Sequence, residues 1–246
     1  MLAVRFVAMH ENHTPDPATT TSTSTTTTTT ADRAAAAAAD GPPALRFPFD
    51  AAVLAETPIR TERLVLRPLE ASDAPDVFEY QRIPDVLKYL PWPLRDRAEA
   101  YEHTAKRAAA RVLADDGDFF VLAMTLPGEP SVEEAAHDRV IGDMMVRVSS
   151  AKHAQLELGW VVHPDFQGTG YAREAAVAIR DFAFETLHPH RIQAFLDARN
   201  DASAKLCERL GMRREATILE EQYNDGEWQD TALYGLLRRE WAAARG

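Results

Sequence analysis

The segment best suited to chemistry runs from an apolar strand pattern at 156–162 through a glycine-containing turn into a helical pattern. The turn reads Gln167-Gly168-Thr169-Gly170-Tyr171-Ala172. The first N–H groups of a helix have no partner inside the helix and lie at the positive end of its dipole, so such a turn can bind an anion. Because glycine has no Cβ, the backbone at Gly168 and Gly170 can approach a phosphate closely. Taken alone, the segment fits a phosphate site and a simple tight turn equally well.

Two common nucleotide-binding motifs do not match this turn. The dinucleotide fingerprint needs a third spaced glycine and an acidic residue after the next strand, and the P-loop needs Gly-Lys-Ser or Gly-Lys-Thr. The sequence has neither feature at this place. A nucleotide-binding protein that uses the turn in another way stays open as an interpretation.

Strand and helix patterns alternate around the turn. Strands are expected at 63–67, 118–124, 140–148, 154–162 and 191–198, helices after 72–75 and over 96–113, 174–187 and 203–210, and a last hairpin at 217–223 and 228–237 around Asn224-Asp225-Gly226. The early strands follow one another and the later ones are separated by helices. This order predicts an α/β fold with a mixed sheet and helices on its faces.

The first 57 residues differ in composition from the rest. Residues 19–30 are all Thr or Ser, and residues 34–39 are all Ala. Such a segment buries too little apolar surface to offset the entropy of ordering it. We therefore expect a disordered tail over residues 1–57, anchored near its end by Leu45, Phe47 and Phe49, and a single domain over residues 58–246.

Composition narrows the classes of partner and location. The chain has 246 residues with 27 Lys and Arg against 38 Asp and Glu, a formal net charge of −11. This balance argues against nucleic-acid or membrane-surface binding and suits a cationic or amine partner. No segment approaches the roughly 20 apolar residues of a membrane span, and no signal peptide is recognisable, so we expect a cytoplasmic protein. Cys207 is the only cysteine, and no His or Cys spacing predicts a metal site.

Five blocks of sequence resemble the GNAT superfamily of N-acetyltransferases. Gln167-x-x-Gly170-x-Ala172 is similar to its acetyl-coenzyme A signature, and the run from Asn200-x-x-Ser203 to Gly211-Met212 is similar to the block that follows. The other three resemble the branch of the RimJ and RimL ribosomal-protein N-terminal acetyltransferases; they lie at 61–68, 89–93 and 225–241. The blocks occur in order over residues 58–242.

The resemblance implies a fold and a coenzyme site. The fold would be a mixed, mostly antiparallel twisted sheet with helices on both faces and a V-shaped opening between its fourth and fifth strands, here 154–162 and 191–198. Acetyl-CoA would be the co-substrate, with pantetheine along the backbone of Trp160, Val161 and Val162. The pyrophosphate would lie on the turn formed by Gln167, Gly168, Thr169, Gly170, Tyr171 and Ala172. Asn200 either bonds a pantetheine amide or is a simple turn residue.

Two residues are candidates for the chemistry. Glu157 lies three residues before Trp160 on the strand expected to carry the thioester, so it is our candidate general base; the alternative is an exposed strand carboxylate. The resemblance does not settle which residue is the base, and Glu220, Glu221 or a water chain are further alternatives. It does point to Ser203 as the general acid for the departing thiolate, unless Ser203 only caps the helix that follows.

The sequence thus predicts an acetyl-CoA-dependent N-acetyltransferase that needs no metal. Its acceptor would be a primary amine, either a protein N-terminal α-amine or a small amine, which attacks directly in a ternary complex. The alternative is a non-catalytic acyl-CoA-binding module. A monomer and a homodimer are both compatible with the sequence.

Overall fold

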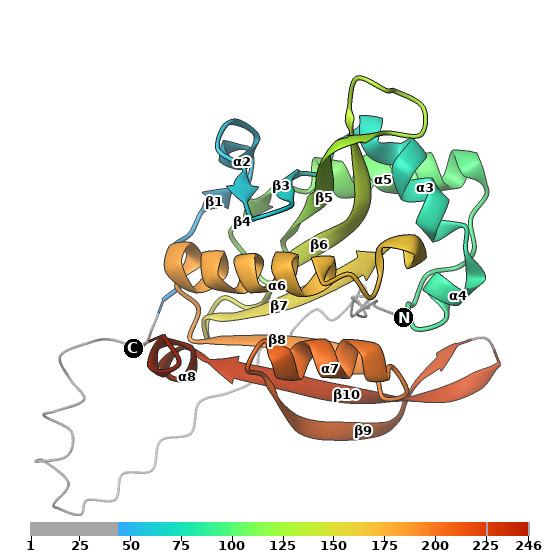
Figure 1. Ribbon diagram of the computed structural model, residues 1–246. Coiled ribbons are helices and arrows are strands. Elements are labelled where there is room, and N and C mark those ends of the chain that lie inside the picture. Colours follow the sequence, from blue (N-terminus) through green and yellow to red (C-terminus); the bar gives the residue numbers. More distant parts are fainter. Residues whose placement is uncertain (1–43, 225, 246) are drawn as a thin grey trace, which may run out of the picture.

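The computed structural model describes residues 44–224 and 226–245. Within them, eight strands form one sheet in the order β2-β3-β5-β6-β7-β8-β10-β9 (Figure 1). The strands are β2 (Ile59–Arg60), β3 (Val65–Pro68), β5 (Phe119–Pro130), β6 (Asp138–Ser150), β7 (Gln155–Val162), β8 (Arg191–Asp197), β9 (Arg213–Asn224) and β10 (Glu227–Leu237). All neighbours are antiparallel except β7 and β8, which are parallel. The mixed, mostly antiparallel sheet is therefore confirmed.

Helices cover both faces of this sheet. They are α2 (Val53–Glu56), η1 (Ala71–Asp73), α3 (Ala74–Gln81), α4 (Pro84–Leu87), α5 (Arg97–Ala109), η2 (Pro164–Phe166), α6 (Tyr171–Phe182) with its π-helical continuation η3 (Ala183–Leu187), α7 (Asp201–Arg209) and α8 (Arg238–Ala243). Helices α6 and α7 lie side by side in front of the sheet in Figure 1. Their apolar residues share one core with Leu158 and Trp160 of β7, whereas α3, α4 and α5 share a second core with Val161. Successive strand residues point to opposite faces, so the two cores lie on opposite sides of the sheet.

The V-shaped opening lies between β7 and β8. The two strands pair at only three positions, Gln155 with Arg191, Leu156 with Ile192 and Glu157 with Gln193. From Leu158 onward, β7 pairs with β6 alone among the residues described. The gap opens toward the C-terminal ends of both strands, where the glycine turn and the start of α7 follow. This confirms the opening expected between these two strands.

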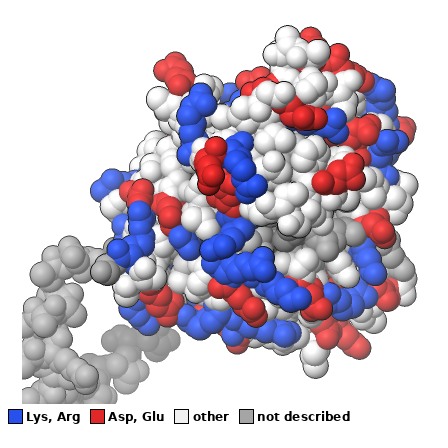
Figure 2. Space-filling model, viewed as in Figure 1, with Lys and Arg blue, Asp and Glu red and all other residues white. Residues whose placement is uncertain are grey.

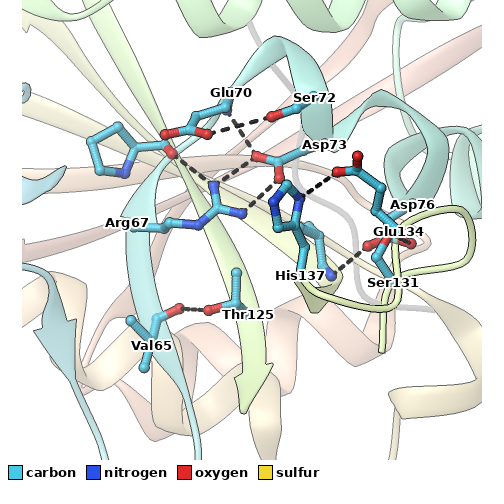
Figure 3. Close-up of polar contacts among 12 residues, drawn as sticks. Val65, Arg67, Glu70, Ser72, Asp73, Asp76, Thr125, Ser131, Glu134 and His137 are labelled. Carbon is cyan, nitrogen blue, oxygen red and sulfur yellow. Dashed lines mark hydrogen bonds and ion pairs between the residues drawn. The ribbon is translucent and has the colours of Figure 1, made fainter. Parts of the chain in front are cut away.

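The start of α3 agrees with its sequence signal (Figure 3). Pro75 lies in the first turn of the helix, directly after the short helix η1. Figure 3 shows the Arg67 guanidinium on the Asp73 carboxylate, with Nη1–Oδ2 and Nη2–Oδ1 distances of 2.8 and 2.7 Å. Asp73 also accepts the N–H of Glu70 at 2.8 Å. These bonds fix the chain between β3 and α3.

Part of the segment expected to be disordered is instead packed on the domain. Residues 49–50 form β1 (Phe49–Asp50), which pairs with β4 (Val112–Leu113), so the helix expected over 96–113 ends at Ala109. The Phe49 ring contacts the rings of Phe120 and Phe182, each at 5.8 Å between centroids. Ala51 and Leu54 are buried as well. The expected boundary at residue 57 is therefore wrong for residues 44–57, because these apolar side chains find partners far along the chain; residues 1–43 lie outside the described residues.

Candidate functional site

A pocket of about 800 Å³ lies at the open end of the gap, between the N-terminal ends of α6 and α7. Five residues predicted to bind the coenzyme line it together: Gln167, Gly168, Gly170, Ala172 and Asn200. They come from two segments about 30 residues apart in sequence, which the parallel β7–α6–β8 crossover brings side by side (Figure 1). The pocket is large enough for an extended ligand of several hundred daltons.

The turn before α6 leaves the end of the helix open. Gly168 and Gly170 have φ values of +77° and +92°, a region that other residues adopt only with strain. Gly170 is the N-cap of α6, and no side chain caps this helix. The Gln167 amide Nε2 donates to the carbonyl of Val162 at 2.7 Å and so holds the turn against the end of β7. The first turn of α6 therefore lies at the pocket with no side chain capping its N–H groups, which are available to an anion.

Basic side chains surround this helix end, although the whole chain is acidic. Arg173, Lys205 and Arg209 line the pocket, and within the described residues none of the three forms an ion pair. Arg199 also lines it but is paired with Asp197 and Glu227, both at 2.6 Å. Figure 2 shows Lys and Arg side chains gathered over α7 and toward α6. These basic residues were not among the predicted site residues, although the i, i+4 spacing of Lys205 and Arg209 on a predicted helix places them on one face.

The edge of β7 toward the gap is formed by the three residues expected to pair with pantetheine. Trp160, Val161 and Val162 are fully buried and pair with β6 on their other side. A strand that lacks a neighbour on one side can accept an extended ligand as an added strand. The position is thus compatible with the predicted arrangement.

Asn200 and Ser203 are joined at the start of α7. The Asn200 side chain accepts the N–H of Ser203 at 3.1 Å, which makes Asn200 the N-cap of this helix. The alternative that Ser203 is the cap is therefore wrong. Ser203 is fully buried, and its Oγ accepts a hydrogen bond from the indole Nε1 of Trp160 at 3.3 Å. This contact places the hydroxyl beside the Trp160 side chain of β7.

Glu157 lies at the closed end of the gap. It occupies the last position at which β7 and β8 pair, on the sheet face opposite Trp160. The side chain is only 1% exposed, and Arg147, directly across on β6, approaches it with Nη1–Oε2 at 3.1 Å. The alternative of an exposed strand carboxylate is therefore wrong. The Arg147 guanidinium thus holds one oxygen of this buried carboxylate.

Two of the predicted turn residues do not line the pocket. The Tyr171 ring lies under the guanidinium of Arg63, and the carbonyl of Thr169 accepts a hydrogen bond from the same group. Cys207 is buried in the core, and burial raises the pKa of its thiol well above the ordinary range.

Neither a metal cluster nor a membrane helix is found in the part of the chain that the structure describes. No group of three or more His, Cys, Asp or Glu residues there could hold a metal ion. No helix there is both long and apolar enough to cross a membrane.

Comparison with known proteins gives consistent matches. Residues 63–213 match the family model described as "Acetyltransferase (GNAT) domain". The chain is 31% identical over 183 residues to the uncharacterized N-acetyltransferase YnaD of Bacillus subtilis, covering 74% of this chain and 98% of that protein. It is 28% identical over 191 residues to the ribosomal protein uS5-alanine N-acetyltransferase of Escherichia coli, covering 76% and 94% of the two chains.

A solved structure shows the same fold. It is RimL, described as a ribosomal L7/L12 α-N-protein acetyltransferase in complex with coenzyme A, and it superposes with a TM-score of 0.60 at 15% identity. The superposition covers 73% of this chain and 97% of RimL.

Proposed function

We propose that this chain, a member of the GNAT acetyltransferase family, transfers acetyl from acetyl-CoA to a primary amine. Within the family it belongs to the RimJ- and RimL-like branch. The observation that carries this proposal is the pocket at the open end of the β7–β8 gap, where an uncapped helix end meets three basic side chains. This combination fits a ligand that carries several phosphate groups and a long extended arm. The relatives' N-acetyltransferase activity supplies the reaction type.

Acetyl-CoA would lie across the pocket and into the gap. Its pyrophosphate would accept hydrogen bonds from the N–H groups between Gly168 and Ala172, at the positive end of α6. Arg173, Lys205 and Arg209 would face the remaining phosphate charge. The pantetheine arm would follow the free side of β7 from Leu158 to Val162. The coenzyme A in the RimL structure supports this choice of ligand.

The acceptor that we propose first is the α-amine of a protein N-terminus. The support is the similarity to the ribosomal protein uS5-alanine N-acetyltransferase and to RimL, described as an α-N-protein acetyltransferase. A small amine is the second candidate, because the acidic balance of the chain suits any cationic acceptor.

Glu157 and Ser203 would serve the two proton transfers of the reaction. The amine nitrogen attacks the thioester carbonyl, the C–N bond forms, the C–S bond breaks, and the sulfur leaves as a thiolate. Glu157, held by Arg147 and shielded from water, would accept the proton that the amine loses. Ser203, whose hydroxyl lies beside the Trp160 side chain, would donate a proton to the thiolate. Backbone N–H groups of β7 that face the gap would stabilise the oxyanion.

A thiol-release assay tests the function. Acetyl-CoA is supplied with a peptide that begins with a free alanine, with the same peptide N-acetylated as a control, and with spermidine. We expect thiol release with the free peptide and none above background with the blocked one. Coenzyme A binding without turnover on any amine would instead support the acyl-CoA-binding module. Thermal stabilisation by ATP but not by coenzyme A would support a nucleotide-binding protein.

The Glu157→Gln variant tests the base. The substitution keeps the size of the side chain but removes its ability to accept a proton, so kcat/KM should fall by roughly 10²–10⁴. The loss should shrink as pH rises, since more of the amine is then free and needs no base. Ser203→Ala should lower kcat/KM without this rescue, because the thiolate still lacks its proton donor. The control is Glu129→Gln, an exposed carboxylate of β5 with no expected role in the reaction. Near-native kcat/KM of Glu157→Gln at neutral pH would remove Glu157 from the mechanism.

A further inference from the structure

The turn between β2 and β3 contacts the glycine turn before α6, although more than 100 residues separate them. Arg63 makes most of this contact. Its Nη1 donates to the carbonyl of Thr169 at 3.0 Å, and its Nε donates to Oε2 of Glu174 at 2.7 Å. Nη2 lies 2.7 Å from the same carboxylate oxygen. One guanidinium thus spans the glycine turn and the first turn of α6.

Glu174 is held on its other oxygen as well. Its Oε1 accepts the backbone N–H of Arg63 at 2.7 Å and the hydroxyl of Thr61 at 2.5 Å. Burial alone would raise the pKa of Glu174, but the bonds from Thr61 and Arg63 outweigh it and lower that pKa. The residue is therefore a carboxylate in the first turn of α6, where its charge would repel a phosphate at the helix end. The paired guanidinium offsets this charge.

The guanidinium also packs on the turn. It lies over the Tyr171 ring, 4.3 Å from the ring centroid. A Cβ on Gly170 would come within 3.2 Å of its Nη2, so the absence of a side chain at Gly170 leaves room for Arg63. Thr169 and Tyr171 thus contact this side chain, and Gly170 leaves room for it. Arg63 lies outside the residues that line the pocket.

We propose that Arg63 is a positioning residue for the coenzyme-binding turn, which it holds in shape while it offsets the charge of Glu174. This inference rests on the proposed function, because it concerns the turn that would bind the pyrophosphate. It predicts that Arg63 acts on the phosphate-bearing half of acetyl-CoA. The acetyl-pantetheine half, which would lie along β7, should not depend on it.

Two thioester substrates allow the two halves of acetyl-CoA to be tested separately. Acetyl-CoA carries the pyrophosphate, and S-acetyl-pantetheine does not. In Arg63→Met, KM for acetyl-CoA should rise at least about fivefold, the effect of one uncompensated charge at a helix end. Its kcat should stay within about twofold of the wild-type value, and kcat/KM for S-acetyl-pantetheine should not change. A general structural role would lower the turnover of both thioesters together, so that pattern would overturn the proposal.

Arg245→Met is the matched control. Arg245 also pairs with a carboxylate, that of Glu185, and lies over an aromatic ring, that of Trp241, at 4.9 Å. These contacts are at the other end of the α6–η3 helix, away from the glycine turn. The substitution should leave both thioesters unaffected.

The double variant Arg63→Met/Glu174→Gln separates the two parts of the role. Removing the Glu174 charge should restore part of the affinity for acetyl-CoA but not all of it, because the turn has still lost its bond at Thr169. Titration with coenzyme A and with pantetheine by calorimetry repeats the comparison without turnover. Equal coenzyme A affinity in the wild type and Arg63→Met overturns the inference. A wild type that binds coenzyme A but acetylates no amine contradicts the proposed function instead.

Discussion

The N-terminal ends of α5 and α6 meet the same physical requirement in opposite ways. Each helix begins with N–H groups that have no partner inside the helix. At α5 the Asp96 side chain accepts the N–H of Glu99 at 2.9 Å, and the Glu99 side chain accepts the N–H of Asp96 at 3.0 Å. At α6 the N-cap is Gly170, and the acidic residue of its first turn, Glu174, is bound to Arg63 and Thr61. The chain's own side chains thus occupy the first end and leave the second open to a ligand.

The difference shows how a helix end becomes a binding site. An acidic first turn is common to both helices and does not distinguish them. What distinguishes α6 is that its carboxylate is bound by Arg63 and Thr61, which lie in the distant turn between β2 and β3. The start of α7 is intermediate, because Asn200 caps the helix and also lines the pocket.

The largest effect on coenzyme A binding is expected from a negative charge placed at the open N-terminal end of α6. Gly168→Asp places a carboxylate on the pocket wall. A Cβ at this position meets nothing within 4 Å, so the substitution adds backbone strain at a φ of +77° but no steric clash. Repulsion between like charges a few ångström apart amounts to about 1–4 kcal/mol, so Kd for coenzyme A should rise at least about fivefold. Calorimetry measures this Kd.

Gly128→Asp is the control for that variant. Gly128 has a similar φ of +83°, and its Cβ also meets nothing within 4 Å, but it lies in β5 and outside the pocket. It should show the same backbone strain and an unchanged Kd. If both variants weaken coenzyme A equally, the loss is due to strain and not to charge at the α6 end.

A smaller effect is expected at the intermediate helix end. Asn200→Asp keeps a good N-cap, so the melting temperature should not fall. The new carboxylate on the pocket wall should raise Kd for coenzyme A by about 2- to 10-fold at low ionic strength and by less at high salt. A salt-independent change would show that the amide of Asn200 bonds the coenzyme directly.

The smallest effect on binding is expected at the capped end. Asp96→Ala removes the cap of α5 and should cost about 0.5–2 kcal/mol of unfolding free energy. For a domain of this size, each kcal/mol corresponds to roughly 2–4 °C in Tm. Kd for coenzyme A should not change. A lowered affinity in Asp96→Ala would mean that the two helix ends are not independent.

Much of the fold could be predicted because its signals are local. The apolar strand pattern at 156–162 identified β7, and the Asn224 to Gly226 turn identified the last hairpin. The two glycines likewise indicate the backbone conformation of the turn that contains them. This predicted phosphate-binding segment lies at the pocket. These features depend on neighbours within a few residues.

What the sequence did not reveal depends on contacts between distant residues. Arg63 and Glu174 are 111 positions apart, and nothing near either residue indicates the pair. The partner of Glu157 follows from the β6–β7 register, which places Arg147 opposite it. Phe49 was expected to anchor the tail, but its partners Phe120 and Phe182 are likewise distant in the sequence.

A crystal structure of the chain with coenzyme A tests the central claim most directly. The account predicts pyrophosphate oxygens within about 2.7–3.2 Å of backbone N–H groups between Gly168 and Ala172. It also predicts the Arg63 guanidinium on Glu174 and away from the phosphates. A pyrophosphate bound elsewhere, with the N–H groups at the start of α6 left to solvent, would contradict it.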